Sequence, residues 1–145
     1  MPVESYKLGP GTMTFDGAGA DVSAQITKGT VTPIVNKTTT AAIPVLNGEE
    51  VPEEHEVSYA WTLDGTLLQD LAASGFIAWT WTNKGLFKSF RYVPNTVEDR
   101  EVTGFVRVDP ILLGGDVKSR PTSDFSFDIT DATGLSADPV FGTIA

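Results

Sequence analysis

The sequence predicts a mainly β domain with one short helix, on the basis of its length, its turn residues and its hydrophobic period. Its 145 residues suit one domain with a substantial core. Hydrophobic residues make up 41% of the chain, and fourteen glycines and nine prolines supply turns, as in a globular β-rich protein. The dominant period is two, the spacing of half-buried strands. We therefore expect a single folded domain over residues 1–145.

Alternation of apolar and polar residues locates the expected strands. In residues 56–64 and 124–129 every second residue is large and apolar, and the neighbours are mainly polar. Residues 77–82 alternate in the same way; the turn Asn83-Lys84-Gly85 and a β-prone run over 86–93 follow, which together predict a hairpin. Further strands are expected over 12–15, 22–35, 39–46 and 101–108.

One segment, residues 66–74, breaks the period of two. Thr66 and Gln69 form a capping-box pair, and Gly75 is a typical helix stop. The leucines of the segment and Ala72 share one stripe at helical spacing. These features predict one short α-helix that covers the sheets, because so short a helix is not stable alone.

Three segments are expected to extend from the packed domain. They are an N-terminal arm over residues 1–11, a long, mobile and partly β loop over 36–55, and a C-terminal arm over 132–145. The loop is rich in Thr, Pro, Gly and Glu and contains the turn signal Asn47-Gly48. The C-terminal segment has no strong periodicity.

The charge balance disfavours anionic partners, and the absence of cysteine excludes disulfides and thiolate chemistry. Ten Lys and Arg against nineteen Asp and Glu give a net charge of −9, which disfavours tight binding to nucleic acid or to anionic membranes. Without cysteine, nothing depends on disulfides or thiolate chemistry. The start of the chain lacks a signal-peptide apolar region, and no apolar run approaches the length of a membrane span. We expect a soluble protein that is not exported by a cleaved signal.

No constellation nominates a catalytic, cofactor-binding or metal site. The single histidine, His55, lies among Glu53, Glu54 and Glu56, where a solvated side chain is the simpler interpretation than a metal ligand or general base. The five aspartates with the most defined contexts are interpreted as polar faces and turn residues: Asp64, Asp109, Asp116, Asp124 and Asp128. We therefore expect no enzyme activity and no cofactor.

Glycines and tryptophans each allow a functional and a structural interpretation. Neither Gly9-Pro10-Gly11 nor Gly17-Ala18-Gly19 has the spacing of a phosphate loop, so both are interpreted as turn or arm glycines. The tryptophans at 61, 79 and 81 could form a sugar-stacking platform, but their strand-like spacing favours core aromatics.

Self-association is the functional hint that the predicted fold itself supplies. An open sheet without disulfides exposes strand edges, and pairing with a second copy is one way to cover them. Head-to-tail contacts of this kind close into rings or continue as filaments.

The sequence resembles the major tail proteins of siphophages, especially those of phages that infect actinobacteria. The resemblance runs nearly end to end and is carried by KLGPGTMTF (7–15), YAWTLDGTLLQDL (59–71), GFIAWTWTNKG (75–85), and TGFVRVDP (103–110) leading into GDVKSRPTSDFSF (115–127). It implies a tail-tube fold, in which two antiparallel sheets pack together with a flanking helix and one sheet joins its neighbours' copies into a barrel. It implies six-membered rings, stacked through the N-terminal arm and the 36–55 loop, and no catalytic residues.

The same resemblance implies the partners and the location. The partners are further copies of the chain, a tape-measure protein, and the tail terminator and tail tip proteins, with genomic DNA passing transiently through the tube. The protein would reside in the virion tail after assembly in the host cytoplasm. Because DNA must slide without sticking, we predict a lumen lined mainly by Asp, Glu, Thr and Ser. A tube protein of a contractile injection or secretion system, and an acidic carbohydrate-binding β-sandwich, are the alternatives.

Overall fold

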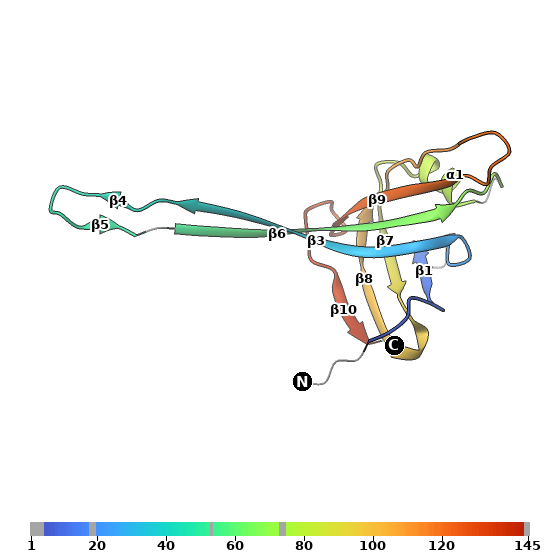
Figure 1. Ribbon diagram of the computed structural model, residues 1–145, viewed down its shortest axis with the longest axis horizontal. Helices are drawn as coiled ribbons and strands as arrows, with labels where there is room; N and C mark the ends of the chain where they lie inside the picture. Colours follow the sequence, from blue (N-terminus) through green and yellow to red (C-terminus); the bar gives the residue numbers. More distant parts are fainter. Residues whose placement is uncertain (1–4, 18–19, 53, 73–74, 144–145) are drawn as a thin grey trace.

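Two layers of antiparallel strands enclose one core, and a long two-stranded arm extends from one of them (Figure 1). The computed structural model describes residues 5–17, 20–52, 54–72 and 75–143. The predicted class, mainly β with antiparallel sheets and one α-helix, is confirmed for these residues. The elements in chain order are β1 (Thr12–Phe15), β2 (Ala20–Asp21), β3 (Ile26–Thr40), β4 (Ile43–Pro44), β5 (Glu50–Val51), β6 (Glu54–Leu68), α1 (Phe76–Thr82), β7 (Phe87–Val93), the 3-10 turn η1 (Thr96–Glu98), β8 (Arg100–Arg107), β9 (Thr122–Thr130) and β10 (Val140–Thr143).

Strand β9 connects the two layers. It pairs with β6 through residues 122–128 and with β8 only at Ile129 and Thr130. One layer therefore has the order β3-β6-β9, and the other has the order β2-β1-β7-β8, with β10 also paired to β8. In Figure 1 the strands of the second layer cross those of the first steeply.

The core lies between the layers and is built largely from aromatic rings. Phe15 of β1 lies with its ring centroid 5.0 Å from that of Phe76 in α1 and 5.8 Å from that of Phe127 in β9. The rings of Phe125 and Phe127 are 5.1 Å apart on the same strand. These stacked, edge-to-face and tilted contacts stabilise the packing beyond simple burial of area.

The predicted helix at 66–74 is wrong, because its first residues continue strand β6. Thr66 and Leu67 each pair with both neighbouring strands, β3 and β9, and Leu68 pairs with Thr122 of β9. Leu67 is buried whereas Leu68 is 44% exposed, so the period of two persists to the end of the strand. Residues 69–72 are not helical, and residues 73–74 lie outside the described part. Pairing on both sides of a strand outweighs a local capping pattern.

The helix instead occupies Phe76–Thr82, where the sequence predicted a strand. Phe76, Ile77 and Thr80 are its buried residues, and their spacing fits one helical face turned to the core. The Asn83-Lys84-Gly85 segment ends this helix and does not form a hairpin turn: the Asn83 N–H donates to the Trp79 carbonyl, and Gly85 adopts φ +79°.

Both predicted extensions at the end and in the middle of the chain are paired. The tail expected as a C-terminal arm folds back, since β10 pairs with Arg100–Thr103 of β8. The 36–55 segment, expected as a partly β loop, is a hairpin in which β3 and β6 pair as far as Thr40 and Glu54, with β4 and β5 beyond them. Residues 5–11 have no helix or strand and are held to the body by the Gly9 N–H, which donates to the Pro94 carbonyl at 2.8 Å.

Gly65 is needed where β3, β6 and the core meet. A Cβ at this position would lie 2.6 Å from the Lys28 carbonyl oxygen and 2.7 Å from the Phe125 ring. We expect Gly65→Ala to lower the free energy of unfolding by about 1–3 kcal/mol, measured by urea denaturation. Gly142→Ala, whose Cβ meets nothing within 4 Å, is the control. Equal midpoints for the two variants would contradict this assignment.

Tyr92 links the layers and makes stability sensitive to alkaline pH. Its hydroxyl donates to the Gly29 carbonyl at 2.9 Å, and burial, with a smaller contribution from Tyr6, raises the pKa of Tyr92 from 10.0 to about 12. The neutral form is favoured on folding, so this contribution is complete below pH 10 and is lost as pH rises towards 12. We expect the free energy of unfolding to fall by about 1–2 kcal/mol across that interval. Tyr92→Phe should show a flatter profile, and an identical slope in both proteins would refute the prediction.

Candidate functional site: an acidic, hydroxyl-rich sheet face

The outer side of the β3-β6-β9 layer carries carboxylates and hydroxyls. The alternation in β9 is strict: Asp124, Ser126 and Asp128 are exposed, whereas Phe125 and Phe127 are buried in the core. Neighbouring strands continue this pattern, because directly paired residues project to the same side of a sheet. We call this surface the acidic face; its polar residues are Lys28, Thr30, Thr32, Thr62, Asp64, Thr66, Thr122, Asp124, Ser126 and Asp128.

Hydrogen bonds from threonine hydroxyls fix two of the three carboxylates. Asp64, on the middle strand β6, accepts from the hydroxyls of Thr32 at 2.8 Å and Thr62 at 2.9 Å, both through Oδ2. Asp124 accepts from the Thr66 hydroxyl at 2.6 Å. Each threonine thus orients a carboxylate and satisfies part of its hydrogen-bonding capacity. The result is an ordered surface of negative charge and hydroxyl groups with a single ammonium group, that of Lys28.

The third carboxylate, Asp128, pairs with a cation at the rim of the face. Arg107, near the end of β8, places Nη2 3.1 Å from Asp128 Oδ2. The same guanidinium donates to Asp109 through Nε at 3.2 Å and Nη2 at 3.3 Å. The hydrogen bonds from Arg107 to Asp109, and then the charges of Asp109 and Asp128, raise the pKa of Arg107. This pairing ties β8 to β9 where the two layers join.

These positions agree with the interpretation of the aspartates as polar faces and turn residues. Asp64, Asp124 and Asp128 lie on the acidic face, and Asp109 pairs with Arg107. Asp116 lies in a turn in which the Ser119 N–H and hydroxyl both donate to its carbonyl. The sequence predicted a surface of Asp, Glu, Thr and Ser, but it did not show which threonines would lie beside these aspartates. The alternation in β3 could have revealed them only with the register against β6.

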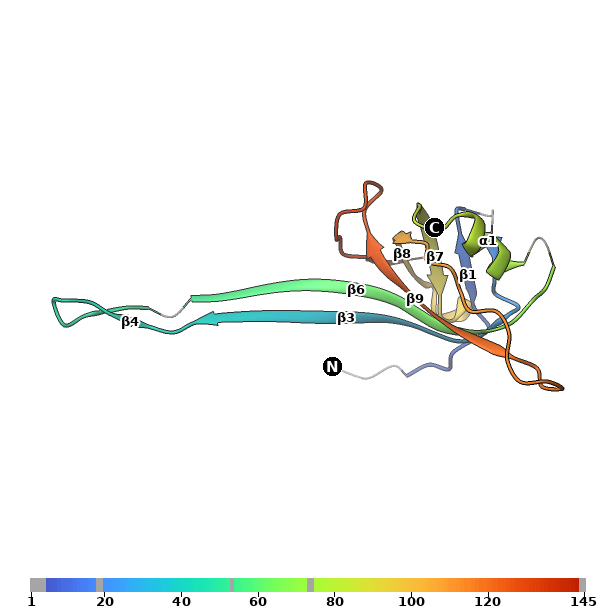
Figure 2. The same cartoon turned by 90° about the horizontal axis from the view of Figure 1, so that it is seen from above.

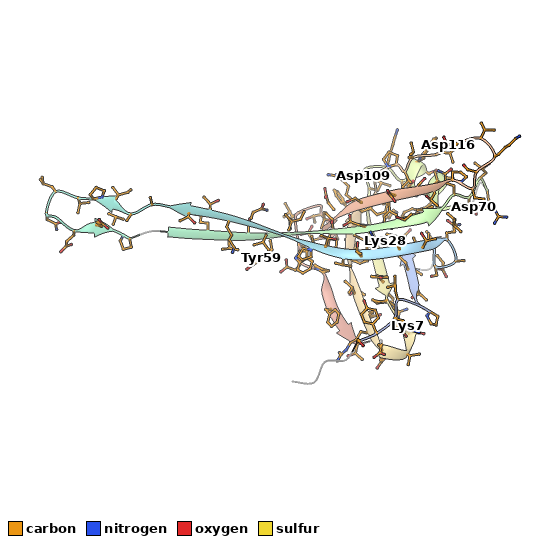
Figure 3. All side chains as sticks on the ribbon, viewed as in Figure 1. Lys7, Lys28, Tyr59, Asp70, Asp109 and Asp116 are labelled. Carbon is orange, nitrogen blue, oxygen red and sulfur yellow. The ribbon has the colours of Figure 1, made fainter. Side chains whose placement is uncertain are left out.

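The arm presents a second unusual surface. We define the arm as residues 34–60, the hairpin beyond the pair Pro33 and Trp61. Figures 1 and 2 show it as a two-stranded ribbon that reaches well past the body, and Figure 3 places Tyr59 near its root. Its exposed large apolar residues are Ile34, Val35, Ile43, Val45, Leu46, Val51, Val57 and Tyr59. So many apolar side chains without cover are typical of an interaction surface.

An open groove of about 500 Å³ lies at the root of the arm. It is lined mainly by apolar side chains, among them those of Val31, Trp61, Val102 and Phe141. Phe141 of β10 is 73% exposed, so this groove continues into further uncovered apolar surface. The lining residues that have a polar group in the side chain are Tyr6, Thr30, Trp61 and Tyr92. Such a lining suits protein contact better than acid–base chemistry.

The tryptophans do not form one flat platform. Trp61 and Trp79 are partly buried and pack against the core, as predicted. Trp81 is 49% exposed, so its assignment to the core is wrong, although its indole N–H donates to the Ile111 carbonyl at 2.7 Å. Trp61 belongs to β6 whereas the other two belong to α1, so the strand-like spacing on which the prediction of core aromatics rested is present only at Trp61.

The remaining candidates give no chemical site in the described residues. The backbone of His55 pairs with Thr39, but its side chain and that of Glu54, like residue Glu53, lie outside the described part, so the solvated interpretation of His55 stays a prediction. Gly17 adopts φ +66° in a turn, and residues 18–19 are outside the described part. Within the described ranges, no group of three or more His, Asp or Glu side chains could hold a metal ion. No helix in those ranges is long and apolar enough to span a membrane.

Comparison with known proteins does not indicate a function, so the acidic face and the arm are the features from which it is inferred. No protein-family model matches the chain, and no curated protein matches it.

Proposed function

We propose that the protein is a structural subunit that polymerises into a tube, as the major tail protein of a long-tailed bacteriophage. The acidic face supports this most directly. It forms the outer side of the three-stranded layer in the body, where the inner side is the core, so it is a large, regular and mainly polar surface, with the exposed Leu68, paired with Thr122, at one end. A surface of this kind suits the wall of a channel better than a binding pocket.

Passage of DNA gives this surface a physical purpose. Duplex DNA carries one negative charge per roughly 1.7 Å of axis, and proteins hold it mainly through Lys and Arg contacts with phosphates. Carboxylates such as Asp64 and Asp124 repel the phosphates, and the fixed hydroxyls around them offer only weak contacts. Repulsion between exposed charges extends over a Debye length of roughly 8–10 Å, enough to keep DNA from the wall.

The arm supplies the contact that would join one ring to the next, as the resemblance implies. Its apolar residues are exposed in the single chain, and Val35 and Tyr59 lie directly opposite each other on one side of the hairpin. Burial of such side chains contributes roughly 25 cal/mol per Å² of apolar area. A neighbouring subunit that covers the arm would therefore gain a sizeable driving force for stacking.

Electron microscopy of the purified full-length protein over a range of concentrations tests the proposal. The expected result is tubes or six-fold rings whose yield rises with concentration. A protein that stays monomeric at every concentration, with and without a nucleating tail tip complex, would contradict it.

A further inference from the structure

The β3-β6-β9 layer ends in two open edges. Strand β3 pairs only with β6, so its other edge has no partner strand among the described residues. Residues 122–128 of β9 pair with β6, and β8 reaches β9 only at Ile129 and Thr130. Within the described chain, this second edge is therefore open along most of β9. Unpaired edges of this length favour pairing with another strand.

Opposite charges stand at these two edges in the same row of the sheet. Lys28 on β3 is paired with Thr66 on β6, and Thr66 is paired with Asp124 on β9. All three project from the acidic face, and Figure 3 labels Lys28 within the body of the molecule. Neither Lys28 nor Asp124 forms an ion pair with another described residue. The two edges are thus complementary in charge, and they belong to two different strands, β3 and β9.

We propose that the β3 edge of one copy pairs with the β9 edge of the next, and that Lys28 forms an ion pair with Asp124 of that next copy. This inference rests on the proposed tube and specifies which edges join in its ring. Because β3 and β9 are both antiparallel to β6, the junction is a parallel pairing. Repeating the sheet without a shift along the strands brings Lys28 beside the neighbour's Asp124. A shift of two residues leaves them diagonal, within reach of a lysine side chain.

A second copy is the occupant that fits both edges. The junction uses two different edges of the same chain, so it is head-to-tail and leaves a free edge of each kind after every addition. The contact closes only when the last copy meets the first. The acidic face then runs across the junction, with Lys28 neutralising the carboxylate nearest to it. A lysine on an edge strand can also act to prevent pairing, and the two roles predict opposite effects of its removal.

Charge reversal separates these roles. Lys28→Glu and Asp124→Lys are each expected to raise the protein concentration needed for tube formation by about tenfold or more, because like charges then face each other across the junction. The double variant Lys28→Glu/Asp124→Lys restores the pair and should assemble within about threefold of the original protein. Lys84→Glu, at an exposed site beyond α1, is the matched control and should assemble normally. Sedimentation and electron microscopy measure assembly, and thermal unfolding confirms that each variant is folded.

The outcomes distinguish this inference from the proposed function. If the original protein forms tubes but Lys28→Glu assembles equally well or better, or the double variant fails to recover, the edge assignment is overturned and the tube stands. If the original protein forms no tubes under any condition, both are overturned. Loss of assembly in each single variant with recovery in the double variant supports both.

Discussion

Removal of the arm is expected to leave a folded body that no longer assembles. Asn36 and Ser58 are directly paired, so a two-residue Asn-Gly turn can join them in place of residues 37–57. No described residue of the arm belongs to the buried core, and the body should therefore keep its thermal midpoint within a few degrees. Tube formation should be abolished, because most of the exposed apolar side chains that would contact the next subunit are gone: Ile43, Val45, Leu46, Val51 and Val57. Sedimentation and electron microscopy provide the measurement.

Point substitutions on the two sides of the arm provide the matched control. Val57→Ser and Tyr59→Ser remove apolar groups from one side and should weaken assembly strongly, whereas Ser58→Ala changes the opposite side and should leave it nearly unchanged. Tubes of normal length and yield from the shortened protein would show that the arm has no part in assembly.

Reversing one charge on the acidic face is expected to make assembled tubes retain DNA. Asp64 is the best position, because it lies on the middle strand of the layer, away from both open edges. Asp64→Lys places one ammonium group per subunit on the proposed channel wall, and repetition along the tube multiplies the phosphate contacts. Retention of linear duplex DNA should then fall more than about tenfold between 50 and 200 mM salt, since each contact contributes roughly −0.9 to the slope of log K against log salt. Co-sedimentation measures it.

Two further variants show whether DNA retention depends on where the new charge lies or only on the net charge of the protein. Glu98→Lys makes the same change in net charge at an exposed site in η1, outside the acidic face, and its tubes should retain little DNA. Asp64→Asn removes the carboxylate without adding a cation, and should retain less DNA than Asp64→Lys. Equal retention by Asp64→Lys and Glu98→Lys tubes would show that this face does not meet the DNA.

The strands were predictable from sequence because their period survives in the fold. Residues 56–64, 86–93 and 124–129 lie in β6, β7 and β9 almost as expected. Both faces of such strands are specified residue by residue, so the acidic side of β9 follows from the sequence. The register that places Asp64 between Thr30 and Ser126 does not follow, because it depends on contacts between distant segments.

The misplaced helix shows where local patterns fail. Thr66 and Gln69 have the pattern of a helix start, yet residues 66–68 are a strand because they pair with β3 and β9. Conversely, Phe76, Ile77 and Thr80 fit a helical face, whereas the alternation of Ile77, Trp79 and Trp81 fits a strand equally well. Only the site against Phe15 and Phe127, formed by other parts of the chain, decides between them. The arm was underestimated for a similar reason, since its turn-rich sequence does not reveal how far two strands stay paired.

The proposed role of the acidic face is tested most directly by a cryo-electron microscopy reconstruction of the assembled tube. We predict that the β3-β6-β9 layer surrounds the channel, with Asp64, Asp124 and Asp128 on its wall and the arm in contact with the adjacent ring. A reconstruction in which these aspartates lie on the outside of the tube, or in which Lys and Arg dominate the channel wall, would contradict the account.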